Sequence, residues 1–109
     1  MSQNQANQDS QHLAGQLSEA LKPPRMFRVI MHNDNITEMD FVVDVLMGIF
    51  QKTKDVAVST MMAIHEKGHG VAGVYTYDIA ISKKIQCDRL ANGRGFPLRV
   101  SLEEDPGTG

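Results

Sequence analysis

Apolar residues between positions 38 and 52 recur at the spacing of an α-helix, and this stretch constrains the fold more than any other. They occupy positions i, i+3, i+4, i+7 and i+8, namely Val42, Val45, Leu46, Ile49 and Phe50. A helix with one apolar face must bury that face against another element. Residues 98–102 alternate apolar and polar side chains, which is typical of a strand with one buried face. The patterns therefore predict a helix that covers one face of a sheet.

The other elements follow from the same periodicities and from the breaker residues between them. The sequence predicts, in order, a strand over residues 26–31, helices over 38–52 and 56–67, a strand over 71–76, a helix over 77–92 and a strand over 98–102. Glycines follow the second and third helices, as at many helix C-termini. This β-α-α-β-α-β order predicts an α+β sandwich, in which three helices pack on a small three-stranded antiparallel sheet.

The two ends of the chain differ in composition from its middle. Residues 1–22 are rich in Gln, Asn and Ser, which predicts a flexible N-terminal extension that ends at the stiff Pro23-Pro24 pair. Residues 23–104 form the predicted domain, and residues 105–109 are expected to be a disordered tail. A chain of 109 residues has room for one such domain.

Charge and cysteine content narrow the class of function. The net charge is −2 and Lys and Arg form no stripe, so we expect no nucleic-acid partner. The chain lacks an apolar signal core and any stretch of membrane-spanning length, so we expect a cytoplasmic protein without a membrane partner. Cys87 is the single cysteine, which excludes an internal disulfide and favours a reducing compartment. It lies in a helical apolar pattern and is therefore expected to be buried.

Short polar side chains fill the turn between the first strand and the first helix. Asn33 and Asp34 tolerate unusual backbone angles and hydrogen-bond locally, so such a turn can aim several oxygens at one point. Thr37 and Asp40 have the spacing of a capping box, which would fix the start of the helix. The turn is interpreted either as a well-capped connection or as the polar part of a binding site.

The run His65-Glu66-Lys67-Gly68-His69 matches the H-E-x-x-H motif of zinc peptidases. That chemistry requires both imidazoles on one face of a helix. Because glycines flank His69, we expect the helix to end before it and the second imidazole to point elsewhere. A third ligand would have to come from scattered residues such as His32. A zinc peptidase is therefore kept only as a weak alternative, and no metal site is expected.

Met61, Ile64 and His65 lie at i, i+3 and i+4 of the second predicted helix and form one patch. The patch is interpreted either as a core stripe with a histidine at its margin or as part of a pocket. Methionine lines adaptable pockets well, and small-ligand sites commonly combine apolar walls with a few polar groups.

Several separated motifs resemble those of one known family. They are Lys22-Pro23-Pro24, Asn33-Asp34-x-x-Thr37-x-Met39-x-Phe41-Val42-Val43-Asp44-Val45-Leu46, Met61-Met62-Ala63-Ile64-His65, Gly73-Val74-Tyr75-Thr76 and Pro97-Leu98. In order and spacing they resemble ClpS, the family of N-degron adaptors of bacterial Clp proteases. The likeness extends from residue 22 to residue 103, so residues 23–104 would form a ClpS-like adaptor domain. Asn35 departs from the pattern, because many ClpS proteins carry a second Asp there.

The resemblance implies how a substrate is bound. Asn33, Asp34 and His65 would bind the free α-amino group and the first peptide bond of the substrate's N-terminal residue, and Thr37 would support them. A hydrophobic pocket would hold the side chain of that residue (Leu, Phe, Tyr or Trp), and its lining would be Met31, Met39, Val42, Met61, Ile64 and Leu98. In the family, the residue that matches Met39 excludes β-branched Ile and Val.

The resemblance also implies the partners. A ClpS protein delivers N-degron substrates to the N-terminal domain of a ClpA-type AAA+ unfoldase, and ClpP degrades them. His65, Asp78 and Lys83 would contribute to docking, and the extension before Lys22 would engage the unfoldase pore. Such an adaptor acts as a monomer and not as an enzyme, with no catalytic residue, metal or cofactor. A ribosome-stalk-like interaction module of similar architecture is the alternative.

Overall fold

Strand β1 (Met26–His32) is the centre of the sheet in the computed structural model, which describes Leu13, Ala14, Gln16 and residues 21–107. It pairs antiparallel with β2 (His69–Thr76) on one side and with β3 (Arg99–Glu104) on the other, so the strand order is β2-β1-β3. This confirms the predicted three-stranded antiparallel sheet. Val29 and Met31 of β1 have no exposed surface, because alternate side chains of the central strand face the helices.

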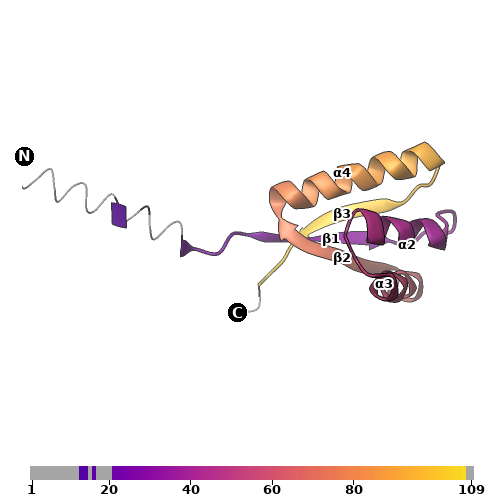
Figure 1. Ribbon diagram of the computed structural model, residues 1–109, viewed down its shortest axis with the longest axis horizontal. Helices are drawn as coiled ribbons and strands as arrows, with labels where there is room; N and C mark the ends of the chain where they lie inside the picture. Colours follow the sequence, from indigo (N-terminus) through magenta and orange to yellow (C-terminus); the bar gives the residue numbers. More distant parts are fainter. Residues whose placement is uncertain (1–12, 15, 17–20, 108–109) are drawn as a thin grey trace, which may run out of the picture.

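Helices α2 (Met39–Gly48) and α3 (Lys54–Lys67) follow β1, and α4 (Tyr77–Arg94) connects β2 to β3. The predicted β-α-α-β-α-β order is thus confirmed. Helix α4 runs along the strands, whereas α2 and α3 lie together at the end of the sheet where β1 ends (Figure 1). The apolar stripe of α2 and the small residues of α4 share one core with β1 and β3; its members include Val29, Met31, Phe41, Val45, Leu46, Ala80, Cys87, Ala91 and Val100. No helix in the described part of the chain is long and apolar enough to span a bilayer.

Helix α2 ends at Gly48, four residues earlier than predicted. The chain leaves the helix because Gln51 takes a left-handed conformation with φ of 51°. The Nζ of Lys83 on α4 donates a hydrogen bond of 2.6 Å to the carbonyl oxygen of Ile49 and thereby pairs one of the last carbonyls of the α2 end. Ile49 is buried all the same. The apolar spacing of the sequence therefore predicted the burial of Ile49 correctly but made helix α2 too long.

The other boundaries differ from prediction by one or two residues. Helix α3 begins at Lys54, and the hydroxyl of Thr53 caps it by accepting a hydrogen bond from the amide of Val56 at 3.3 Å. Helix α4 continues through Gly93 to Arg94, and its C-cap is Gly95, which has a φ of 73°. Such a left-handed residue after a helix favours glycine.

Cys87 is fully buried in α4, as predicted. Burial raises the pKa of its thiol to about 12. The thiol is therefore protonated at neutral pH and packs as a small apolar group.

Most of the predicted N-terminal extension lies outside the described residues, which include only positions 13, 14, 16, 21 and 22 of it. The last two residues of the predicted tail, 108 and 109, lie outside them as well. The strands and helices named above run from Met26 to Glu104. The division into an extension, a domain over 23–104 and a tail stays a prediction.

Candidate functional site

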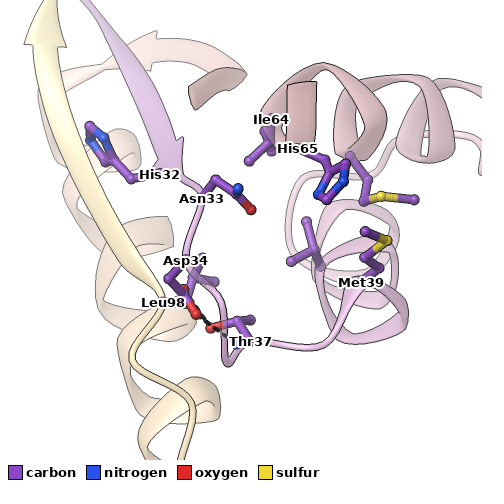
Figure 2. A pocket seen from close by; sticks show the side chains of 10 residues that line it. His32, Asn33, Asp34, Thr37, Met39, Ile64, His65 and Leu98 are labelled. Atoms are coloured by element: carbon purple, nitrogen blue, oxygen red, sulfur yellow. Dashed lines mark hydrogen bonds between the residues drawn. The ribbon is translucent and has the colours of Figure 1, made fainter. Parts of the chain in front are cut away.

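A pocket opens where the end of β1, the start of α2 and the last turns of α3 meet (Figure 2). Ten side chains line it, and all but the first belong to the predicted set: His32, Asn33, Asp34, Thr37, Met39, Val42, Met61, Ile64, His65 and Leu98. The space between them is about 300 Å³, a figure that includes open solvent at the mouth. The pocket thus combines polar groups from the turn after β1, together with His32 and His65, with apolar groups from several elements.

A turn built around Asp34 forms the polar side of the pocket. Its Oδ1 accepts hydrogen bonds from the amides of Ile36 at 2.8 Å and Thr37 at 2.6 Å, and its Oδ2 accepts one from the Thr37 hydroxyl at 2.7 Å. Burial alone would raise the pKa of Asp34, but the bonds from Thr37 and Ile36 outweigh it and hold the pKa below its usual value. Asp34 is therefore a carboxylate at neutral pH, and Thr37 fixes its orientation.

The same bonds show that the predicted capping box of Thr37 and Asp40 is wrong. The N-cap residue of α2 is Glu38, and no side chain caps this helix end. The hydroxyl of Thr37 donates to Asp34 instead, because Asp34 lies three residues earlier in the same turn. The turn residues therefore orient a carboxylate beside the pocket and not the start of the helix.

A backbone hydrogen bond fixes Asn33 relative to His65. The amide of Asn33 donates to the carbonyl oxygen of Gly68 at 2.9 Å. Gly68 is the C-cap of α3, with a φ of 90°, and His65 lies on the last turn of that helix. The bond thus ties the end of β1 to the end of α3. The side chain of Asn33 points into the space between these elements, and His65 lies across that space (Figure 2).

Apolar side chains from three parts of the chain form the walls. Val42 on α2, Ile64 on α3 and Leu98 before β3 are buried and belong to the core. Met61 is partly buried, and Met39 keeps 43% of its surface exposed. Both methionines are unbranched and can adapt to the shape of a ligand. The walls are thus rigid where they join the core and adaptable nearer the mouth.

Met31 was expected in the lining, but the structure places it in the core. It has no exposed surface and is not among the side chains that border the pocket. The reason is strand alternation, which turns Met31 to the helix-covered face together with Val29.

His32 lines the pocket, although the sequence suggested it only as a possible zinc ligand. Its Nε2 lies 2.7 Å from the hydroxyl oxygen of Ser101 on β3, and its ring points away from Asn33 (Figure 2). Burial lowers the pKa of His32, and the charges of Arg99 and His69 lower it further. Its place directly before Asn33 in the chain was the signal that could have found it.

The H-E-x-x-H motif does not form the face that a zinc peptidase needs. His65 lies on α3, whereas His69 is the first residue of β2 and pairs with His32 of β1. The prediction that the helix ends before His69 is confirmed. Among residues 13–14, 16 and 21–107, no three His, Cys, Asp or Glu side chains are grouped to hold a metal ion.

The three predicted docking residues differ in accessibility. His65 and Asp78 are exposed, and Asp78 lies in the first turn of α4. Lys83 is half-buried, and its Nζ also donates to the Oε1 of Gln51 at 3.2 Å and lies 5.1 Å from the ring centre of Tyr75. Its ammonium group is therefore engaged within the fold.

Comparisons with known proteins point to one family. The family model for the ATP-dependent Clp protease adaptor protein ClpS matches residues 22–101. The ClpS adapter proteins of Oleidesulfovibrio alaskensis and Lawsonia intracellularis are 53% and 50% identical over 88 residues, which is 81% of this chain and 85% and 81% of theirs. The structure of Agrobacterium tumefaciens ClpS2 bound to L-phenylalaninamide matches with a TM-score of 0.73 and 32% identity, over 76% of this chain and 100% of that one.

Proposed function

The chain belongs to the ClpS family of Clp protease adaptors, which are not enzymes, and we propose that its pocket binds the free N-terminal hydrophobic residue of substrates. The residues accepted are Leu, Phe, Tyr and Trp, and the adaptor delivers the bound proteins to a ClpA-type AAA+ unfoldase for degradation by ClpP. The observation that carries the proposal is a single pocket with hydrogen-bond acceptors beside its mouth and apolar side chains along its walls.

The polar groups suit a protonated amine. A free α-amino group has a pKa of about 7.7–8, so it is mostly an ammonium with three donors at neutral pH. Asn33, Asp34 and an unprotonated nitrogen of His65 are the acceptors that border the pocket. Asp34 adds a negative charge that its hydrogen bonds from Thr37 and Ile36 keep ionised. Charge-assisted hydrogen bonds of this kind contribute about 1.5–3 kcal/mol each.

The apolar walls suit the side chain of the same residue. Burying a Leu- or Phe-sized side chain contributes about 1.5–3 kcal/mol. Micromolar affinity corresponds to about −8 kcal/mol, and association itself carries an entropic cost. The side chain alone and the amine alone therefore both fall short. Recognition requires an unblocked amine and an apolar side chain on one residue, which is the definition of a hydrophobic N-degron.

The relative from A. tumefaciens supports this assignment. That ClpS2 protein is bound to L-phenylalaninamide, which has a free amine and a phenylalanine side chain, while an amide blocks its carboxyl group. The ligand thus carries the two features named above.

Fluorescence anisotropy with labelled peptides tests the proposal. Peptides that begin with free Leu, Phe, Tyr or Trp should bind at micromolar concentration or below, while their N-acetylated twins should lose at least tenfold in affinity. Peptides that begin with free Ser or Gly serve as controls for the apolar requirement. Equal binding of the free and acetylated forms would refute the proposal.

Delivery depends on a second surface, for which we propose exposed His65 and Asp78. Asp78→Asn should weaken binding to the N-terminal domain of a ClpA-type unfoldase and leave peptide affinity unchanged. Asp55 is an exposed carboxylate in the first turn of α3, so Asp55→Asn is the matched control. Equal docking by the Asp78 variant and the wild type would remove Asp78 from this surface.

We further propose that the adaptor is a monomer and that residues 1–21 act in delivery. Deleting these residues should slow degradation of a substrate without changing peptide affinity.

A further inference from the structure

We propose that Gly70 sets the depth of the pocket by letting Ile64 pack close to strand β2, and so limits the size of the N-terminal side chain that binds. This inference rests on the proposed function, since it concerns the selection of ligands by the same pocket. Gly70 does not border the pocket itself. It acts through Ile64 and is therefore a positioning residue.

The space beside Gly70 is already occupied by Ile64. A Cβ atom at residue 70 would lie 2.7 Å from Cγ1 and 3.6 Å from Cδ1 of Ile64. It would also lie 3.7 Å from the backbone nitrogen of Ile64, so the helix itself passes close to the strand. A carbon–carbon contact of 2.7 Å is strongly repulsive, since the optimum is about 3.5–4.0 Å. Any residue other than glycine therefore requires Ile64 to move.

Position 70 requires glycine because a larger side chain would not fit there, and not because the backbone conformation favours glycine. Among the residues that the structure describes, the glycines with positive φ are Gly68, Gly95 and Gly107. Gly70 instead lies in regular strand geometry and pairs with Met31 of β1. An alanine would fit the backbone at Gly70, so its effect would come from the contact with Ile64.

If the side chain of Ile64 is displaced, free space is available to it in only one direction. The strand cannot retreat, because Gly70 pairs with β1 and Met31 has no exposed surface. A β-branched side chain on a helix has one strongly preferred χ1 rotamer, so Ile64 cannot turn aside at low cost. Protein cores are close-packed, and the empty space that Ile64 borders is the pocket. Ile64, with or without the turn of α3 that carries it, therefore moves into the pocket.

The consequence depends on the size of the ligand side chain. Phenylalanine and tryptophan reach farther from the backbone than leucine does, so they meet the displaced Ile64 first. Overpacking of a filled site costs about 1–3 kcal/mol, which is roughly a 5- to 150-fold change in an equilibrium constant. A shallower pocket should therefore shift the preference from aromatic residues toward leucine.

The test is Gly70→Ala, measured by anisotropy with free-amine peptides that begin with Leu, Phe or Trp and with their acetylated twins. We expect affinity for the Phe and Trp peptides to fall by about tenfold or more, and affinity for the Leu peptide by about threefold at most. Gly73→Ala is the matched control, because a Cβ there would collide with the ring of Tyr75 and residue 73 does not border the pocket. It should lower thermal stability and keep the wild-type ratio of Phe to Leu affinity.

A second variant keeps the test decisive if Gly70→Ala folds poorly. Ile64→Ala removes the atoms that would collide, so adding Gly70→Ala to it should change neither the melting temperature nor the ratio of Phe to Leu affinity. A melting temperature that falls equally in both backgrounds would show that Gly70 is needed for another reason. A wild-type affinity ratio in folded Gly70→Ala would overturn the inference. Failure of the wild type itself to prefer free-amine peptides would instead refute the proposed function.

Discussion

The substitution Thr37→Val separates the orientation of Asp34 from its charge. Valine has the shape of threonine but lacks the hydroxyl that donates to Oδ2 of Asp34 at 2.7 Å. Oδ1 keeps its bonds from the amides of Ile36 and Thr37, which the substitution does not remove. The carboxylate therefore stays in the turn and stays ionised at neutral pH. What it loses is the bond that fixes its second oxygen.

The magnitude follows from the kind of bond that is lost. A hydrogen bond to a charged group contributes about 1.5–3 kcal/mol, and both partners are half-buried, which favours the lower end. We expect Thr37→Val to lower the free energy of unfolding by about 1.5 kcal/mol, which corresponds to a fall in melting temperature of about 6–12 °C. A carboxylate free to rotate should bind an ammonium about five- to tenfold more weakly, which is about 1–1.4 kcal/mol.

The effect on stability should depend on pH in a defined direction. The hydrogen bonds hold the pKa of folded Asp34 below its ordinary value of 3.8. The stability that Asp34 contributes is then fully present above about pH 4 and is lost as the pH falls through the lower, folded pKa. Thr37→Val raises the pKa of Asp34 toward 3.8, so the difference between variant and wild type should be constant near neutral pH and shrink below about pH 4.

The assays are urea unfolding at neutral and acidic pH and peptide anisotropy at neutral pH. Thr60→Val on α3 is the control, because it makes the same change of side chain at a residue outside the pocket lining. The free-amine peptide should lose affinity in Thr37→Val, while the weak binding of the acetylated peptide should not change. Wild-type affinity in a variant that has lost the expected stability would refute a role of Thr37 in orienting Asp34 for the ligand.

Two further predictions concern other residues. Lys83→Met should lower the free energy of unfolding, measured in urea, by about 1–2 kcal/mol, because Lys83 donates to the carbonyl oxygen of Ile49 and to the side-chain oxygen of Gln51. Lys84→Met is its control and should lower that free energy by only about 0.5 kcal/mol, because it removes a surface ion pair. Cys87 should react with a thiol reagent only as fast as the protein unfolds, because its thiol is buried and protonated; fast labelling of the native protein would be inconsistent with the structure.

The sequence predicted the elements better than their ends. Periodicity reports which side chains are buried, so it found β1, α2 and β3 correctly. It counted Ile49 as helical because that residue is buried, although the chain had already left α2 at Gly48. The true end depends on the left-handed conformation of Gln51, and Lys83, which is 34 residues away along the chain, pairs the Ile49 carbonyl there; apolar spacing reports neither of these.

The polar turn shows a second limit of local patterns. Thr37 satisfies two local motifs, a capping box with Asp40 and a side-chain turn with Asp34. The spacing alone cannot rank them, because both place a hydroxyl near a backbone or carboxyl group. The structure selects the turn, in which the carboxylate of Asp34 accepts three hydrogen bonds.

The grouping of the pocket residues came from family resemblance and not from periodicity. Helical spacing joined Met61, Ile64 and His65, but nothing local related them to Asn33 or Leu98, which lie on other elements. Strand alternation, applied to β1, would have moved Met31 from the pocket to the core.

Two residues that need not touch the ligand set the shape of this pocket. Thr37 orients the carboxylate of Asp34, and the absence of a side chain at Gly70 lets Ile64 lie close to β2. The backbone bond from Asn33 to Gly68 then links the polar turn to the end of α3, four residues beyond Ile64. A shift of α3 caused at Gly70 would therefore be passed on to Asn33, because this bond fixes Asn33 relative to His65. The amine contacts should then be largely kept in Gly70→Ala, and the free and acetylated Leu peptides should differ about as much as in the wild type while the aromatic peptides lose affinity.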